Sequence, residues 1–299
     1  MWSDLYAWFQ SMAWLFGGAE GRWARAAIGA AGGITVAWLA VRSRSLTRQG
    51  AVSAAVMGTG YTALGGILWF GALLVFFATS SRLSRWKRKH RRKAEAELLY
   101  EKTGARDAGQ VWANGGAGLA LCAAHAIWPH TGWLYVFIGV MAAVNADTWA
   151  TELGSLSRVQ PISIRTGRRV PTGTSGGITA VGSAAAAAGA LTVGVFAACA
   201  ALLPGAWSEE GQAGTVLVAI VATALLGGVI GAFVDSYLGA TVQAMYRCEE
   251  CGKETERVEH CGRRTSVVRG LPWMNNDAVN VLSSVVAGAA AWGISRWLG

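Results

Sequence analysis

The sequence predicts an all-α fold, a polytopic membrane bundle of about eight transmembrane helices, and three observations support this prediction. Of the 299 residues, 53% are hydrophobic and only 14% are charged, whereas soluble domains carry about 25% charged residues. The mean hydropathy is +0.36. Glycine is abundant, with 40 residues, and small residues let membrane helices pack closely. We therefore expect residues 1–299 to form a single membrane domain.

Eight apolar runs are candidates for the membrane-spanning helices. They cover residues 25–41, 51–64, 67–80, 111–128, 133–149, 178–203, 215–234 and 278–297. The runs at 51–64 and 67–80 are shorter than the ~20 residues that cross a bilayer squarely. Because Gly65-Gly66 separates them, they form either a tight hairpin of short helices or one crossing with a broken element.

The charges between these runs predict the orientation of the chain. Alternating spans place the connections 42–50, 81–110, 155–177 and 247–272 on one face of the membrane, and all four are basic. The connections 65–66, 129–132 and 204–214 fall on the other face and contain no Lys or Arg. Lys and Arg are enriched in cytoplasmic loops. We therefore expect a protein of the cell inner membrane with both termini outside.

The most basic connection is the cytoplasmic segment 82–106. It is either an anchor that fixes the topology or a site that gathers anionic nucleotide or lipid. Basic cytoplasmic loops of this kind account for the formal net charge of +9, so nucleic acid is not an expected partner.

Acidic side chains interrupt three apolar segments near their cytoplasmic ends. Asp147 and Glu152 lie in the segment 145–154, Asp235 in 231–243 and Asp277 in 273–280. Such residues are rare and usually functional, because an ionised carboxylate costs at least ~2.5 kcal/mol at mid-helix in a bilayer. We expect the three segments to meet and to hold Mg²⁺, which prefers oxygen ligands and is shared with substrate phosphates. The alternative is that these residues satisfy one another between packed helices.

Polar neighbours of these acids are candidates to line the same cavity. Helical spacing places Asn145, Thr148 and Glu152 on one stripe, with Asp147 on a neighbouring stripe. Further candidates accompany the other two aspartates: Ser236 and Gln243 follow Asp235, and Asn275, Asn276 and Asn280 flank Asp277.

Two connections have the character of phosphate-binding segments. The loop 171–177 contains Gly173, Thr174 and Ser175 and leads into the 178–203 span. A helix N-terminus offers free N–H groups to an anion, although a plain flexible loop would have the same composition and no P-loop lysine is present. In the segment 104–116, Arg106 could bind phosphate and Asn114 could reach into the cavity.

Cys248, Cys251, His260 and Cys261 lie together in the cytoplasmic loop 247–272 and resemble half a zinc ribbon. Three thiolates and one imidazole make a closed tetrahedral zinc site, which leaves no open position for catalysis. His260 and Cys261 are adjacent, which is an unusual spacing. A free-thiol loop and an iron–sulfur centre are the alternatives, while the cytoplasmic placement disfavours a disulfide.

Six motifs, taken in order, resemble those of a widespread family of polytopic membrane proteins. They occupy residues 79–83, 105–116, 145–154, 173–177, 235–243 and 273–280. The characterised branch of that family is the phytyl-phosphate kinase of the vitamin E pathway in plants and cyanobacteria. The family is distantly similar to CTP-dependent polyprenol kinases and CDP-lipid synthases. One departure is Ser175, where the family motif has Asn; a serine can still donate a hydrogen bond.

The resemblance implies a magnesium-dependent enzyme that transfers the γ-phosphate of a nucleoside triphosphate, CTP being favoured, to an isoprenyl monophosphate of the phytyl or geranylgeranyl type. In this hypothesis Asp147, Asp235 and Asp277 hold Mg²⁺, and Glu152 orients a metal-bound water or a ligand hydroxyl. Arg106, the loop 173–177 and the pair Asn275/Asn276 grip phosphates, and the apolar tail lies between helices in contact with membrane lipids.

Two other hypotheses fit the same sequence. A polyprenol kinase or a CDP-lipid-forming cytidylyltransferase would use the same scaffold with a different lipid–nucleotide reaction. An ion-coupled transporter would use the acidic residues as ion or proton sites.

Overall fold

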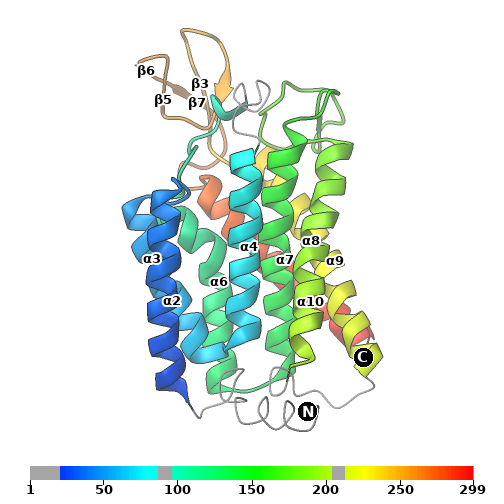
Figure 1. Cartoon of the computed structure of the whole chain (residues 1–299). Helices are drawn as coiled ribbons and strands as arrows, with labels where there is room; N and C mark the ends of the chain where they lie inside the picture. Colours follow the sequence, from blue (N-terminus) through cyan, green and yellow to red (C-terminus); the bar gives the residue numbers. More distant parts are fainter. Residues whose placement is uncertain (1–20, 87–95, 204–212, 299) are drawn as a thin grey trace.

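The computed structural model describes residues 21–86, 96–203 and 213–298. Residues 87–95 of the basic segment 82–106 and most of the connection 204–214 lie outside the described residues. The described part contains eight helices: α2 (Arg22–Arg42), α3 (Arg48–Gly65), α4 (Ile67–Trp86), α6 (Ala108–Ile127), α7 (Thr131–Gly154), α8 (Ala180–Ala201), α9 (Ala213–Thr241) and α10 (Asn276–Leu298). Six of them, all except α3 and α6, are long and apolar enough to cross a membrane. The expected all-α membrane bundle is confirmed (Figure 1).

The two short apolar runs form separate helices joined by a tight turn. Gly66 connects α3 to α4 with φ = 77°, a left-handed conformation that glycine adopts without steric cost. The Gly66 N–H donates to the carbonyl of Tyr61, which closes the end of α3. Residues 51–80 therefore belong to a hairpin rather than to one broken crossing, but its helices are longer than the apolar runs, with 18 residues in α3 and 20 in α4.

Helix α7 forms the centre of the bundle and packs against α4, α6, α8, α9 and α10. Almost all of its side chains from Leu134 to Ala146 are buried. Small residues allow this close packing: a Cβ built on Gly231 would lie 2.4 Å from the Cβ of Ala143. Because small residues bring helix backbones together in membranes, the abundance of glycine and alanine in the sequence is explained by these contacts.

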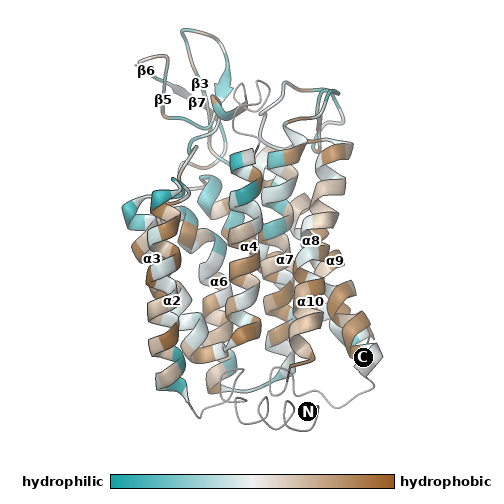
Figure 2. Cartoon of the chain, viewed as in Figure 1, coloured by the Kyte–Doolittle hydropathy of each residue, from teal (hydrophilic) through white to brown (hydrophobic). Residues whose placement is uncertain are grey.

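Hydrophobic and polar residues are separated along the bundle axis. Figure 2 shows apolar residues through the middle of the helices and polar residues at the upper end, where the longer connections lie. In Figure 1, α2 begins and α10 ends at the opposite end of the bundle. The structure therefore has one polar end that carries the loops 96–107, 155–179 and 242–275.

Short β-strands order two of these loops. Strands β1 (Ile162–Ser163) and β2 (Gly177–Ile178) pair antiparallel and close the loop before α8. Between α9 and α10, β3 (Met245–Arg247), β4 (Glu254–Thr255) and β7 (Ser266–Arg269) form a sheet in the order β4-β3-β7, while β5 (Glu259–His260) pairs with β6 (Arg263–Arg264). We call residues 243–275 the β-module.

Candidate active site

A cavity of about 290 Å³ opens at the polar end of the bundle. Helices α4, α6, α7, α9 and α10 contribute to its wall, together with the N-terminus of α8 and parts of the three loops. Its lining includes the whole loop 172–179. The polar side chains that line it outside this loop are Ser45, Ser81, Ser84, Arg85, Glu97, Tyr100, Lys102, Thr103, Arg106, Gln110, Asn114, Asp147, Thr148, Thr151, Glu152, Ser155, Ser183, Asp235, Ser236, Gln243, Glu256, Asn276 and Asn280.

Most of the residues that the sequence analysis selected lie on this cavity. They are Arg106, Asn114, Asp147, Thr148, Glu152, Gly173, Thr174, Ser175, Asp235, Ser236, Gln243, Asn276 and Asn280. Segments that are far apart in the chain, from residue 106 to residue 280, therefore meet at one place. Asn145, Asn275 and Asp277 are not part of the lining.

The three lining carboxylates of α7 and α9 differ in their partners. Asp147 makes no hydrogen bond or ion pair with any described residue, although it faces the cavity. Asp235 Oδ2 accepts a hydrogen bond of 3.1 Å from Ser283, and Glu152 accepts one from Ser84. Burying an ionised carboxylate without a partner is costly, so the charge of Asp147 would be neutralised by a bound cation or by a proton.

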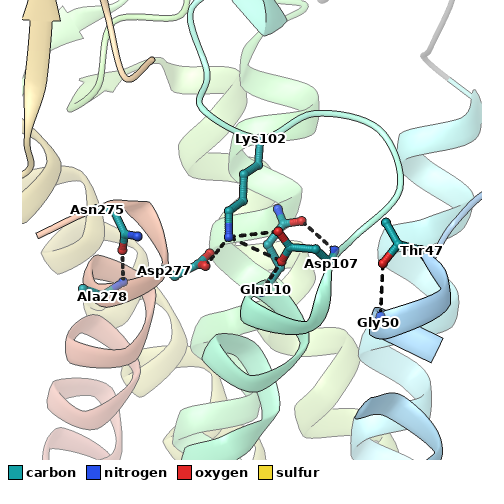
Figure 3. Close-up of polar contacts among 8 residues, drawn as sticks. All are labelled: Thr47, Gly50, Lys102, Asp107, Gln110, Asn275, Asp277 and Ala278. Atoms are coloured by element: carbon teal, nitrogen blue, oxygen red, sulfur yellow. Dashed lines mark hydrogen bonds and ion pairs between the residues drawn. The ribbon is translucent and has the colours of Figure 1, made fainter. Parts of the chain in front are cut away.

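Asp277 belongs to an ion-paired cluster rather than to the cavity wall (Figure 3). Its Oδ2 lies 2.5 Å from Lys102 Nζ, which also lies 3.1 Å from Asp107 Oδ2. Burial lowers the pKa of Lys102, but the hydrogen bonds to Asp277 and Asp107 raise it, and the net shift is upward. Asp107 in turn caps α6 through a reciprocal pair of hydrogen bonds with Gln110. The Lys102 side chain thus ties the start of α10 to the start of α6.

The structure separates Asp277 from the other two aspartates of the expected metal site. Asp277 already has a cationic partner, and its Oδ1 is buried without a hydrogen bond to any described group. Among the described side chains, Asp147, Asp235 and Asp277 do not form a cluster of ligand atoms; the one such cluster lies in the β-module. The sequence could not separate the three acids, because the partner of Asp277 comes from a residue 175 positions away.

Two asparagines selected from the sequence serve the packing of the helices. Asn145 Nδ2 donates to the carbonyl of Gly189 at 2.8 Å, and its Oδ1 accepts from Thr79 at 3.2 Å, so this buried amide joins α7 to α8 and α4. Asn275 Oδ1 accepts from the backbone N–H of Ala278 at 3.0 Å and caps α10. Helical spacing alone does not distinguish a packing amide from a cavity-lining one.

The loop before α8 lies directly against α9. Gly176 has φ = 81°, and a Cβ at this position would lie 2.7 Å from the carbonyl oxygen of Ser236. Only glycine fits both the conformation and the contact. Ser175 Oγ donates to Gln243 Oε1 at 2.8 Å, and Thr179 caps α8 by accepting from the N–H of Gly182 at 2.9 Å. The loop is thus held at the N-terminus of α8, an anion-favouring position.

Arg106 lies at the edge of the cavity. Its backbone is fixed by hydrogen bonds of 3.0 Å with Ser45 and Thr47. The guanidinium lies 5.7 Å from the ring centroid of Phe76, and Nη1 donates to Ser81 Oγ at 3.0 Å. That is the only hydrogen bond of the guanidinium to the described part of the protein, so most of its five N–H donors are available to a ligand.

Several cavity residues come from segments that the sequence analysis did not select for the site. Tyr100 lies among four carboxylates, those of Glu256, Glu152, Glu97 and Asp147, and burial together with these charges raises its pKa. It is therefore a neutral phenol, able to donate a hydrogen bond. Burial likewise raises the pKa of Glu256.

The β-module holds the segment 96–102 in place. Glu256 N–H donates to the carbonyl of Leu99 at 2.9 Å, Thr255 Oγ1 donates to the same carbonyl at 2.8 Å, and Arg257 Nε donates to the carbonyl of Tyr100 at 2.7 Å. No motif or periodicity in the sequence predicts these contacts. Ser81 and Ser84 could have been identified from the sequence, because Ser81 lies in the motif 79–83 and Ser84 follows it at helical spacing on α4.

The four candidate zinc ligands come together at the tip of the β-module. The ligand atoms of Cys248, Cys251, His260 and Cys261 all lie within 4.8 Å of one another. His260 Nδ1 lies 3.5 Å from Cys251 Sγ and 3.2 Å from Cys261 Sγ. Cys261 has φ = 53°, and in this conformation two adjacent residues face the same centre. This group could bind a metal such as zinc.

Comparison with known proteins places the chain among integral membrane proteins. The family described as Integral membrane protein DUF92 matches residues 31–288. Protein PGR of Arabidopsis thaliana is 30% identical over 265 residues, covering 83% of this chain and 88% of that protein. Uncharacterized membrane protein MJ0933 of Methanocaldococcus jannaschii is 28% identical, covering 83% of this chain and 84% of that protein. Uncharacterized membrane protein sll0875 of Synechocystis is 26% identical, covering 77% and 78%.

No solved structure matches the chain. The family match extends from the middle of α2 to the middle of α10 and so includes every helix that lines the cavity. The chain is therefore a member of the integral membrane family DUF92.

Proposed function

We propose that the protein is a magnesium-dependent phosphotransferase that uses a nucleoside triphosphate, CTP being favoured, to convert an isoprenyl monophosphate into the diphosphate. The observation that carries this proposal is the composition of the cavity. It combines the unpartnered carboxylate of Asp147 with Arg106 and the glycine-containing loop 173–177. Phosphoryl transfer depends on positioning the phosphates and neutralising their charge, for which acids that hold a metal ion and N–H donors that bind phosphate are suited.

The residues present fit a magnesium ion better with two aspartates than with three. Asp147 and Asp235 come from neighbouring helices, α7 and α9, and lie close enough to interact electrostatically. Mg²⁺ commonly uses one or two carboxylates and completes its shell with waters and substrate phosphates. When bound, the ion would neutralise charge on the phosphates of the nucleotide. Glu152 and Ser84 would orient the water or hydroxyl ligands beside it.

In the proposed reaction, the chain's own residues position two phosphates. An oxygen of the lipid monophosphate forms a bond to the γ-phosphorus of CTP, the bond from that phosphorus to the bridging oxygen breaks, and CDP leaves. The attacking monophosphate is already ionised near neutral pH, so no strong general base is needed. Arg106 and Lys102 would bind phosphate oxygens by charge-assisted hydrogen bonds, and the N–H groups of the loop 173–177 would hold a second phosphate.

We further propose that Cys248, Cys251, His260 and Cys261 bind a structural zinc ion. Three sulfur atoms and one nitrogen form a complete tetrahedral set for Zn²⁺, with no position left for substrate. The ion would fix the β-module, whose residues Thr255 and Arg257 hold the segment that carries Tyr100 and Lys102. Zinc would thereby shape the cavity without taking part in the chemistry.

The cavity would face the cytoplasm, where nucleotides are available. In the described residues, the basic loops 155–177 and 247–272 lie at the polar end with the cavity, and Lys and Arg favour the cytoplasmic side. Both termini would then lie on the outer face of the membrane.

The test is to incubate purified protein with Mg²⁺, labelled CTP and a panel of isoprenyl monophosphates and isoprenols. The proposal predicts that the γ-label moves to lipid and that monophosphates are the acceptors. Movement of the α-label would establish cytidylyl transfer instead, and labelling of free isoprenols alone would establish a polyprenol kinase. A protein that gives no lipid product but moves ions across sealed vesicles would be a transporter.

A further inference from the structure

We infer that an apolar groove between α2, α3, α4 and α6 binds the hydrocarbon chain of the lipid monophosphate, an inference that rests on the proposed function for the identity of the headgroup. The groove is a second cavity, of about 60 Å³, next to the polar one. Its wall is apolar except for Arg106 and Asn114. These two residues also line the polar cavity, so the two spaces meet at a pair of side chains.

The position of Arg106 fits a lipid headgroup at this junction. The planar guanidinium pairs well with phosphate oxygens, and in the described part of the protein it makes one hydrogen bond, to Ser81. The guanidinium also lies 5.7 Å from the ring centroid of Phe76, which belongs to the groove. A lipid monophosphate bound to Arg106 would therefore have its phosphate next to the polar cavity and its hydrocarbon chain next to the groove.

The dimensions and the exposure of the groove suit a chain that enters from the bilayer. Its α4 wall runs from Phe70 to Phe77, which is about 10 Å of helix. Leu74 in this wall is 37% exposed on the outer surface of the bundle, where the lipid chains of the membrane would lie. The groove therefore holds the carbons nearest the headgroup, while the rest of a long chain extends along the helices into the membrane.

The first experiment locates the chain directly. Wild-type protein in detergent is irradiated with an isoprenyl monophosphate that carries a diazirine on its second isoprene unit, and the labelled peptides are identified by mass spectrometry. We expect labels on α3 and α4 around Ala54 and Leu74, reduced by unlabelled isoprenyl monophosphate but not by the matching isoprenol. Labels confined to other helices, or labelling that the isoprenol reduces equally well, as for an ordinary bilayer lipid, would overturn the inference.

The second experiment narrows the groove. Ala54→Trp places a large side chain in it, whereas Val52→Trp puts the same side chain on the membrane-facing surface of α3, where Val52 is 67% exposed. We expect A54W to raise the KM for a long-chain monophosphate at least tenfold, and to leave turnover of a five-carbon monophosphate within twofold of wild type. V52W should match wild type with both acceptors.

The outcomes distinguish a failure of the groove as the chain-binding site from a failure of the proposed reaction. An unchanged KM for the long chain in A54W, or an equal loss with both acceptors, would overturn the groove as the chain-binding site. If wild-type protein phosphorylates no acceptor at all, the proposed function fails, yet the crosslinking experiment still shows whether a phosphorylated lipid occupies the groove.

Discussion

At the residue scale, the structure distinguishes acids that look alike in the sequence. Asp147 and Asp277 both follow or precede apolar runs, and both fit a metal site by composition. In the structure Asp147 faces the cavity without a described partner, whereas Asp277 is paired with Lys102. The type of residue and its local spacing are readable from the sequence, but the partner depends on a contact between distant segments.

Asp147→Asn tests the metal-binding role of this carboxylate. The substitution removes one negative charge and one oxygen ligand while preserving the shape of the side chain. We expect phosphate transfer to fall by roughly 100-fold or more, the usual order for the loss of a group that stabilises the transition state. Initial rates with labelled CTP measure the effect. The matched control is Glu254→Gln, the same change of carboxylate to amide on the exposed strand β4, and it should retain full activity. Equal rates for wild type and D147N would show that Asp147 has no role in the reaction.

Lys102→Met tests the ion pair that joins α6 to α10. Lys102 and Asp277 are 26% and 17% exposed, so losing the cation leaves Asp277 poorly solvated and unpaired. We expect a loss of about 2 kcal/mol in stability, measured as a lower Tm in detergent. The double variant K102M/D277N should recover part of that loss because it also removes the stranded charge. A double variant less stable than K102M alone would argue against the pair.

The cluster of Lys102, Asp277 and Asp107 also predicts a pH dependence of stability. The pKa of Lys102 is raised in the folded protein. Its stabilising contribution to the folded state is therefore complete below the unfolded-state pKa of about 10.4 and is lost as the pH rises through the folded-state pKa. The pKa of Asp107 is lowered: burial opposes this shift, and the hydrogen bonds from Gln110 and Lys102 outweigh it. Its contribution is therefore present above about pH 4 and is lost in acid. The Tm difference between wild type and K102M should stay constant from about pH 5 to about pH 9 and shrink outside that window. A difference that disappears near neutral pH would contradict this assignment.

At the element scale, the β-module shows what cysteine spacing can and cannot predict. The spacing identified Cys248, Cys251, His260 and Cys261 as one group, and the structure brings their ligand atoms together. It gave no indication that the same loop contacts the segment 96–102 through Thr255, Glu256 and Arg257. Such contacts depend on tertiary packing of two polar loops, for which neither periodicity nor a motif exists.

Cys251→Ala tests whether the β-module holds zinc. We expect elemental analysis to find about one zinc per chain in the wild type and close to none in the variant, since three remaining ligands bind zinc much more weakly. Because metal binding is coupled to folding of such modules, the variant should also have a lower Tm and lower transferase activity. Cys199→Ala, at a cysteine of α8 outside the group, should keep both zinc and activity. Wild-type protein purified without zinc, and a C251A variant of unchanged Tm, would exclude the zinc site.

At the scale of the whole molecule, apolar runs predicted the number and order of the helices but not their ends. Helix α9 continues to Thr241 and α7 to Gly154, beyond the runs that end at Val234 and Trp149. Hydropathy falls where polar residues accumulate, whereas backbone hydrogen bonding continues α9 for about two further turns and α7 for about one and a half. Those added turns carry Asp235 and Glu152, so part of the cavity wall comes from helix ends that hydropathy does not predict.

The orientation of the bundle is testable with single cysteines. In a Cys199→Ala background that keeps the proposed zinc ligands, with labelling followed at the introduced cysteine, Arg168→Cys marks the exposed loop at the polar end and Pro129→Cys marks the exposed connection at the other end. The account predicts that a membrane-impermeant maleimide labels P129C in intact cells and labels R168C only after the membrane is opened. The reverse pattern would place the cavity outside the cytoplasm and remove its access to nucleotides.

The most direct test of the central claim is the stoichiometry of the products. Purified protein is mixed with Mg²⁺, CTP and an isoprenyl monophosphate, and CDP and isoprenyl diphosphate are quantified together by mass spectrometry. We expect the two products to rise in a one-to-one ratio, EDTA to stop the formation of both, and D147N to form neither. CDP without lipid diphosphate, or a cytidylylated lipid with pyrophosphate, would contradict it.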